Sequence, residues 1–95
     1  MDKVILDGKK LISETIATDY IFSRFEFPEY YGNDLESLYD AFADINEDMT
    51  IVIINRNVME STAYGSKLSW VLEDAANDNG HLTLVWMDED YADDD

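Results

Sequence analysis

Apolar residues recur at helical spacing in two stretches of the chain. Leu35, Leu38, Phe42 and Ile45 stand three, four and three residues apart, so a helix here places all four side chains on one buried face. A later stretch repeats the spacing i, i+3, i+4, i+7 and i+8, and its members are Leu68, Val71, Leu72, Ala75 and Ala76. Each pattern predicts an amphipathic helix that packs against a common core.

The segment before the earlier helix carries signals that stop and restart the chain. Pro28 disfavours helix at Phe27, and Gly32 permits a backbone turn that a Cβ atom would hinder. Asn33 is the expected N-cap of the helix, because its side-chain oxygen accepts from a free backbone N–H. A loop therefore separates this helix from the residues that precede it.

Two other helices have expected boundaries. The later amphipathic helix is expected to open at Gly65-Ser66 and to end at Asn79-Gly80. Upstream, a less regular apolar pattern over residues 16–22 predicts a further helix, with Ser13 or Thr15 as its cap. Arg24 lies near the end of that helix, where a positive charge suits the helix dipole.

Three short apolar runs, at residues 4–6, 50–54 and 82–86, favour strands. The middle run has four β-branched aliphatic residues in a row and does not alternate, which is typical of a strand covered on both faces. Residues 55–61 allow one short helical turn. Helices between successive strands imply right-handed crossovers, so we expect an α/β fold with a small three-stranded parallel sheet packed with three to four helices.

Length and composition indicate one domain with a tail. The chain has 95 residues, which suits a single modest core, and 46% of them are apolar, which excludes wholesale disorder. We expect the domain to span residues 1–87. Residues 88–95 form an acidic tail that is expected to be disordered, because it has too few apolar groups to bury itself.

The charge balance limits the kinds of partner that the chain attracts. It has 22 acidic and 6 basic residues and a net charge of −16, which repels nucleic acid and anionic membranes and attracts basic proteins. The same charge favours a monomer in the free state. The chain has no cysteine, no apolar signal segment and no run of membrane-spanning length, so we expect a cytoplasmic location.

Acidic residues recur on the polar side of the earlier helix and continue one turn beyond it: Glu36, Asp40, Asp44, Glu47 and Asp48. Like charges four residues apart destabilise a helix by about 0.2–0.5 kcal/mol per pair. No Lys or Arg occurs between residues 24 and 56 to relieve this repulsion locally. A stripe that lowers the stability of its own helix suggests a cationic partner.

Three tyrosines favour a binding surface over a merely solvated face. Tyr30 and Tyr31 precede the helix, and Tyr39 lies beside Asp40. Aromatic side chains next to uncompensated charge are typical of the residues that dominate binding at protein interfaces. The competing interpretation stays open: exposed acidic residues are often only solvated, and general acidity also serves solubility.

Little in the sequence points to catalysis or to a cofactor. His81 is the single histidine, and it occupies an ordinary polar position at the edge of a predicted strand. The four glycines are far apart and form no phosphate-binding loop. Residues 44–48 lack the glycine and the distant Glu of a calcium loop. We therefore expect no enzymatic activity, no metal site and no cofactor.

One segment of the chain is similar to a known family. Pro28-Glu29-Tyr30-Tyr31-Gly32, followed by Leu35, Leu38 and Asp40, resembles the signature of the barstar family, small inhibitors of barnase-type ribonucleases. The order of the predicted elements over residues 2–86 agrees with this resemblance. The resemblance implies a barstar-like fold and a protein that blocks the active site of a basic ribonuclease in a one-to-one complex.

The resemblance also implies roles for individual residues. It gives Asp40 the central role, with its carboxylate in the place of a substrate phosphate. Tyr30 and Gly32 line the same surface, Glu36 matches the second acid of the helix, and Tyr31 supports the loop.

This chain departs from the family pattern at several positions. Asp34 stands where the family usually has Asn, and Tyr39 where it usually has Trp. The family's acidic contact on the last long helix corresponds best to Asp74 and Asp78. The expected partner-binding residues are therefore Tyr30, Gly32, Asp34, Glu36, Tyr39, Asp40, Asp44, Asp74 and Asp78.

Three functional interpretations remain. The first is an inhibitor, as an antitoxin or immunity protein, of a barnase-like ribonuclease, with no direct contact to nucleic acid or membrane. The second is an acidic module or nucleic-acid mimic that occupies a basic protein other than a nuclease. The third is a metal-dependent domain or enzyme. The first is preferred, because the tyrosine and glycine segment with Asp40 downstream resembles the barstar family.

Overall fold

The computed structural model describes residues 2–25, 27 and 34–88. These residues form three strands, four α-helices and one short 3-10 helix: β1 (Asp2–Asp7), η1 (Gly8–Lys10), α1 (Glu14–Phe25), α2 (Leu35–Ala43), β2 (Met49–Ile54), α3 (Arg56–Glu60), α4 (Ala63–Asp78) and β3 (Leu82–Trp86). The predicted α/β class is confirmed. No helix within the described ranges is long and apolar enough to cross a lipid bilayer.

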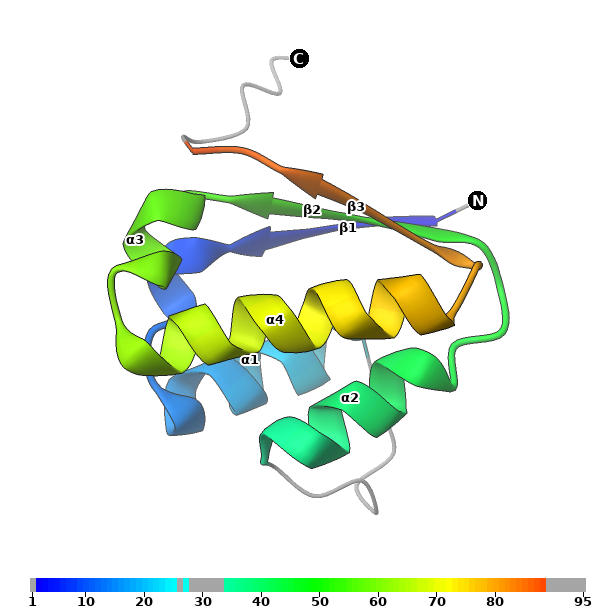
Figure 1. The fold of residues 1–95 in the computed structure, drawn as a ribbon, viewed down its shortest axis with the longest axis horizontal. Coiled ribbons are helices and arrows are strands. Elements are labelled where there is room, and N and C mark those ends of the chain that lie inside the picture. Colours follow the sequence, from blue (N-terminus) through cyan, green and yellow to red (C-terminus); the bar gives the residue numbers. More distant parts are fainter. Residues whose placement is uncertain (1, 26, 28–33, 89–95) are drawn as a thin grey trace.

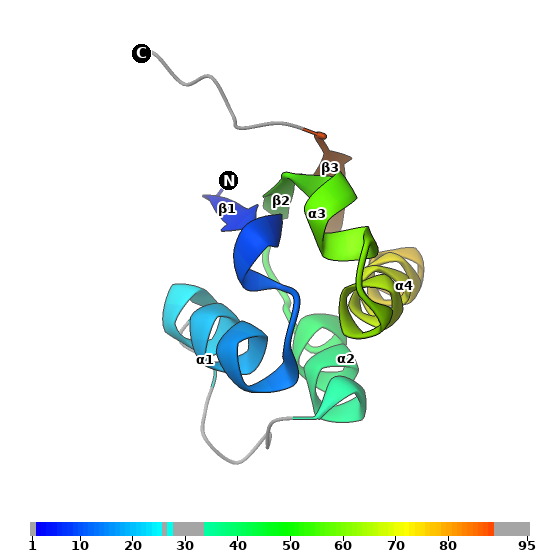
Figure 2. The ribbon, with the colours of Figure 1, turned by 90° about the vertical axis from the view of Figure 1, so that its left-hand side faces the viewer.

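The sheet is parallel, with β2 in the centre and the order β1-β2-β3. Leu6 of β1 pairs in register with Ile53 of β2, which pairs with Trp86 of β3. Helices α1, α2 and α4 pack on one side of this sheet, and α3 lies at the end where β2 finishes (Figures 1 and 2). The protein is thus built from two layers, a sheet and a layer of helices.

The central strand is buried from Ile51 to Ile54, as its unbroken apolar run predicts. Ile51 and Ile53 belong to the core between the sheet and the helices. Val52 has the opposite orientation, because successive side chains of a strand point to opposite faces. It lies between its register partners Ile5 and Val85 and is 4% exposed, although the described helices α1, α2 and α4 pack on the other side of the sheet and not on both sides (Figure 2).

An aromatic cluster joins the end of α1 to α2. The ring of Phe42, which is fully buried, makes edge-to-face contacts with Phe25 and Phe27, at centroid distances of 5.1 Å and 5.4 Å. Phe25 and Phe27 stack on each other at 5.2 Å. These contacts fix the position of α2 against the rest of the helical layer.

Helix α4 begins two residues earlier than the sequence pattern indicates. Thr62 is its N-cap, and the Thr62 hydroxyl accepts a hydrogen bond from the Gly65 N–H at 3.0 Å. Gly65 therefore lies inside the first turn. It is required there by close packing, because a Cβ atom at this position would lie 1.9 Å from the carbonyl oxygen of Met59.

Helix α1 confirms the less regular pattern upstream. The Ser13 carbonyl accepts from the Ala17 N–H at 2.9 Å, and Arg24 lies in the last turn. Ala17 and Ile21 are buried, whereas Ile16 is 55% exposed and lies outside the core. The short helix α3 confirms the helical turn expected within residues 55–61.

Candidate functional site

Helix α2 has the two faces that its sequence predicts. Leu38 and Phe42 are fully buried, and Leu35 packs against the core from a partly exposed position. Glu36 and Asp40 stand on the exposed side, four residues apart. The helix ends at Ala43, so Ile45 reaches the core from the loop that follows.

The N-terminus of α2 is capped by Asp34. Its Oδ1 atom accepts a hydrogen bond from the Ser37 N–H at 2.8 Å. This bond is the main reason why the pKa of Asp34 lies below its ordinary value. The prediction that Asn33 caps this helix is wrong. A carboxylate at the cap also interacts favourably with the helix dipole, which an amide does less strongly.

A tyrosine joins α2 to the last helix. The hydroxyl of Tyr39 on α2 donates a hydrogen bond to the Asp78 carboxylate on α4. The pKa of Tyr39 is raised, first by this hydrogen bond, then by partial burial, and further by the negative charges of Asp78, Asp74 and Asp40. Three carboxylates from two helices therefore lie close enough to Tyr39 to act on the same phenol.

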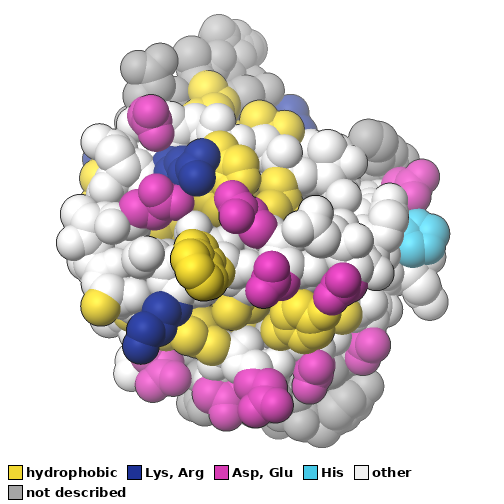
Figure 3. Space-filling view, in the orientation of Figure 1, with side chains coloured by type: hydrophobic (Ala, Val, Ile, Leu, Met, Phe, Trp, Pro, Cys, Tyr) yellow, Lys and Arg dark blue, Asp and Glu magenta, His cyan; other side chains and the backbone are white. Residues whose placement is uncertain are grey.

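These residues form one exposed surface, which we call the acidic face: Glu36 and Asp40 of α2, and Asp74 and Asp78 of α4. Figure 3 shows acidic side chains over α2 and the C-terminal half of α4, whereas the Lys and Arg side chains of this view lie toward α3, toward the N-terminal half of α4 and at the top of the view by the sheet. Within the described part of the chain, no ion pair involves any of the four carboxylates. Their charge is left unbalanced by the folded chain.

Three of the predicted acidic residues lie elsewhere. Asp44 is the exposed C-cap residue of α2. Glu47 and Asp48 do not continue the helical stripe, because α2 has ended by Ala43; they belong to the loop before β2. Asp48 Oδ1 lies 3.0 Å from Nδ1 of His81, so the single histidine pairs with an acid of this loop.

Two residues that the resemblance assigns to the partner, Tyr30 and Gly32, lie outside the described residues, as does Tyr31. Their roles stay predictions. The segment that contains them ends directly before Asp34, the cap of α2, so the chain connects them to the N-terminal end of the acidic face.

Asn79 has a role that the sequence pattern did not reveal. Its Nδ2 group donates to the carbonyl oxygens of Phe42, Ala43 and Ile45 at 3.0, 3.2 and 2.8 Å. The carbonyls of Phe42 and Ala43 belong to the last turn of α2, where carbonyls lack partners within the helix, and that of Ile45 belongs to the loop that follows. Asn79 ends α4, as predicted, and also fixes the end of α2 next to it. Only the three-dimensional structure brings these segments together.

The chemistry of the acidic face is that of cation recognition. Among the residues that the structure describes, no three His, Cys, Asp or Glu side chains converge closely enough to hold a metal ion. Glu73, beside Asp74, is turned toward Arg56, with 3.8 Å between Glu73 Oε2 and Arg56 Nη2. The remaining exposed carboxylates offer acceptors to cationic groups that approach from outside.

Comparison with known proteins agrees with this arrangement. The family model described as Barstar (barnase inhibitor) matches residues 1–88. The chain is also 31% identical, over 74 residues, to the protein named "Putative ribonuclease inhibitor YrdF" of Bacillus subtilis (strain 168); the match covers 77% of this chain and 80% of that protein. The fold is the three-stranded parallel sheet with helices that the resemblance implied. Since the family model spans nearly the whole chain, this protein belongs to the barstar family.

Proposed function

We propose that this chain is an inhibitor of a basic, barnase-type ribonuclease and that it covers the active site of that enzyme with its acidic face in a one-to-one complex. Membership of a family of barnase inhibitors supports the class of target. The name of the similar Bacillus subtilis protein points to the same class. The chain itself performs no catalysis in this function, and we expect it to act in the cytoplasm as an antitoxin or immunity protein.

One observation carries the proposal: Asp40, Asp74 and Asp78 surround Tyr39 on an exposed surface where the described chain provides no cation. Carboxylates held close together repel one another, and burial against cations of a partner removes this repulsion. A ribonuclease active site holds the phosphates of RNA and therefore presents such cations. The acidic face is complementary to it in charge.

The geometry of α2 favours a rigid inhibitor. Asp34 caps its first turn, Asn79 holds its last carbonyls, and Phe42 fixes it in the core. Asp40 lies between these fixed points, so little conformational freedom is lost when its carboxylate meets a cation. In this position the carboxylate competes directly with a substrate phosphate.

The other members of the acidic face act with Asp40. Glu36 lies one turn before it on α2, and Asp74 and Asp78 extend the surface onto α4. Tyr39 supplies an aromatic surface among these charges. Together with the large net charge of the chain they attract a basic enzyme over long range, an effect on association rate for which barnase and its own inhibitor are a standard example.

Inhibition of RNA cleavage tests the proposal directly. Purified chain is titrated into barnase and into other small basic ribonucleases of its type, with a fluorogenic RNA as substrate. We expect complete inhibition of at least one enzyme at a one-to-one ratio. Asp40→Ala should weaken this inhibition by a factor of about 100 or more, which is the scale of a dominant interface residue.

Reversal of the charge at Asp40 gives an outcome that would contradict the proposal. Asp40→Lys reverses an exposed charge, so circular dichroism should show an unchanged fold while inhibition is lost. If this variant inhibits as well as the wild type, α2 does not contact the active site. If no ribonuclease of the panel is inhibited, the target is another class of basic protein.

A further inference from the structure

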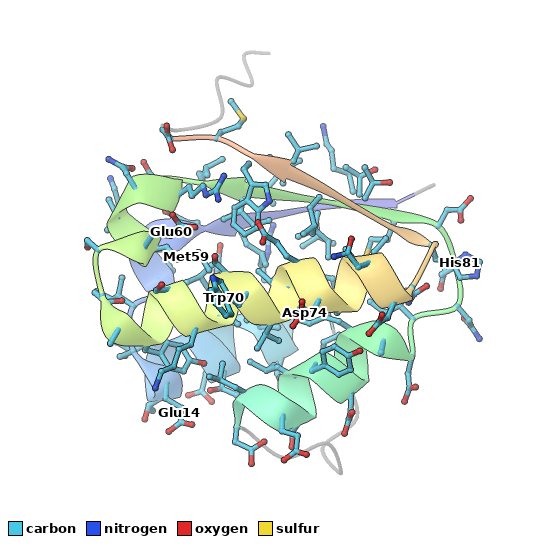
Figure 4. The ribbon with its side chains drawn as sticks, in the orientation of Figure 1. Glu14, Met59, Glu60, Trp70, Asp74 and His81 are labelled. Carbon is cyan, nitrogen blue, oxygen red and sulfur yellow. The ribbon has the colours of Figure 1, made fainter. Side chains whose placement is uncertain are left out.

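Trp70 is the most exposed large apolar side chain in the described residues, at 72%. It lies on α4 but outside the apolar stripe that builds the core, whose members around it are Leu68, Leu72 and Ala75; Val71, which the spacing assigned to that stripe, is only partly buried and does not belong to the core. Trp70 and Asp74 both project outward from the same side of α4 (Figure 4). They stand four residues apart, and Asp78 follows after another four. The indole is therefore continuous with the acidic face.

The surroundings of Trp70 differ from those of the second tryptophan. Trp86 is partly buried, and the guanidinium of Arg56 lies over its ring, 4.5 Å from the centroid. That arginine is held in turn by Glu60, with 2.9 Å between Nε and Oε2. Within the described residues no ring or cation contacts Trp70 in this way. The chain thus supplies a cation to one tryptophan and leaves the other open.

A single exposed apolar residue is ordinary in a soluble protein. The position of Trp70 next to unbalanced carboxylates favours a role in binding a cation. Trp is the aromatic side chain that attracts cations most strongly, and arginine stacks on its face. A carboxylate one helical turn away, such as that of Asp74, can accept hydrogen bonds from the same cation. The pair resembles, in an exposed setting, the arrangement of Trp86, Arg56 and Glu60 within the chain.

We propose that Trp70 is a further contact for the ribonuclease and that it receives an arginine or lysine side chain at the rim of the enzyme's active site. This inference rests on the function proposed above and extends the contact surface along α4. At about 1.5 Å per residue, Trp70 lies about 12 Å along the helix axis from Asp78. The contact would therefore involve a cation outside the central phosphate-binding site.

The test compares truncation of Trp70 with truncation of another exposed apolar residue that lies outside the acidic face. Trp70→Ala, Trp70→Phe and the control Ile16→Ala are measured against the ribonuclease that the wild type inhibits best. Ile16 is 55% exposed on α1, a helix that contributes nothing to the acidic face. We expect Trp70→Ala to raise the Kd about tenfold or more, mainly through faster dissociation. Trp70→Phe should retain part of the affinity, and Ile16→Ala should change nothing.

Salt dependence separates an aromatic contact from a charge effect. Asp74→Asn removes a charge and should flatten the dependence of log Kd on log salt concentration. Trp70→Ala should shift that line while leaving its slope unchanged, because the indole is neutral. Circular dichroism of each variant checks that the fold is retained.

The results distinguish the two proposals. If the wild type inhibits and Trp70→Ala binds within twofold of it, the role of Trp70 is refuted while the proposed function stands. If the wild type inhibits no enzyme, the proposed function fails and the role of Trp70 fails with it. Loss of affinity in Ile16→Ala equal to that in Trp70→Ala would also refute a specific contact.

Discussion

Tyr39 and Asp78 lie 39 residues apart in the chain, yet the phenol of the one donates a hydrogen bond to the carboxylate of the other. This contact joins α2 to α4 at the surface, above the packing of their buried sides. It also holds Asp78 beside Asp40 and Asp74, since all three act on the same phenol. The acidic face is therefore a property of the packed pair of helices and not of either helix alone.

The Tyr39 contact predicts a pH dependence at alkaline pH. The raised pKa means that the folded state favours the neutral phenol. Its contribution to stability is complete below the ordinary value of 10.0 and is lost as the pH rises through the folded pKa. In an absorbance titration of the phenolates, the group that disappears in Tyr39→Phe should titrate above 10.0. Burial raises the pKa of Tyr64 as well. The variant Tyr64→Phe therefore identifies the titration of that phenol, so that it is not mistaken for the titration of Tyr39. A missing group that titrates at or below the ordinary value would contradict the contact.

Neutralising a carboxylate of the acidic face should stabilise the folded chain, although the same substitution abolishes binding to the ribonuclease. Asp40 has like charges one turn away on either side, Glu36 and Asp44. Asp40→Asn should therefore raise the free energy of unfolding by about 0.2–0.5 kcal/mol per relieved pair, measured by urea denaturation at low salt. The gain should shrink as salt is added. Glu60→Gln is the matched control and should lower stability, because Arg56 and Ser69 hold that carboxylate.

Removal of the Asn79 side chain should loosen the end of α2. Asn79→Ala removes the side-chain donor from the carbonyls of Phe42, Ala43 and Ile45 and should lower the free energy of unfolding by about 1–3 kcal/mol, although the Phe42 carbonyl still accepts from the Ile45 N–H at 3.3 Å. Asn77→Ala, at an exposed position of α4 two residues earlier, should change it by less than about 0.5 kcal/mol. Equal effects of the two substitutions in urea denaturation would show that the bonds of Asn79 contribute nothing particular.

The cap of α2 should respond to acid in a residue-specific manner. Asp34→Ala removes the acceptor for the Ser37 N–H and should lower the unfolding temperature by several degrees, whereas Asp34→Asn should retain most of the cap. The pKa of Asp34 is lowered, so its charge-dependent contribution is present above the ordinary value of 3.8 and is lost as the pH falls through the folded pKa. Between about pH 5 and pH 2 the carboxylate of Asp34 becomes protonated. Over this range the free energy of unfolding should fall less in Asp34→Asn than in the wild type.

Substitution by alanine should destabilise the chain at Gly65 and be tolerated at Gly80. A Cβ atom at Gly65 would lie 1.9 Å from the Met59 carbonyl oxygen, whereas one at Gly80 would meet nothing within 4 Å. Gly65→Ala should therefore destabilise the chain by about 1–3 kcal/mol or more, because α3 and α4 must move apart. Gly80→Ala should lie within about 0.5 kcal/mol of the wild type. Thermal unfolding of both variants decides the matter, and a tolerated Gly65→Ala would refute the packing of these two helices.

Periodicity sufficed for the elements with strong local patterns. The unbroken run of β2 predicted a buried strand, which is confirmed, and the apolar stripe of α2 is confirmed for Leu38 and Phe42. Leu35 is only partly buried, and Ile45 packs against the core from beyond the end of the helix. Helix ends were harder to predict, because neighbouring residues can have similar propensities for the cap position. Asp34 prevails over Asn33 at one helix, and Thr62 precedes the expected start at another.

The acidic face was predictable only in part. Spacing alone placed Glu36 and Asp40 on the exposed side of one helix. The distant acids Asp74 and Asp78 were assigned from the family resemblance, because no local pattern relates them to Tyr39. Asn79 was predicted as the end of α4, but its hydrogen bonds to the end of α2 were not predictable, since the carbonyls that it binds lie more than thirty residues earlier in the chain.

The buried and the exposed faces of α2 and α4 have different roles. Leu38, Phe42, Leu68 and Leu72 lie fully or almost fully within the core, whereas other residues of the same helices are exposed: Glu36, Asp40, Trp70, Asp74 and Asp78. Exchanges among the outer residues leave the interior packing untouched. Descendants of such a protein can thus drift toward new enzymes through surface substitutions alone, so target range and foldability evolve on separate sets of positions.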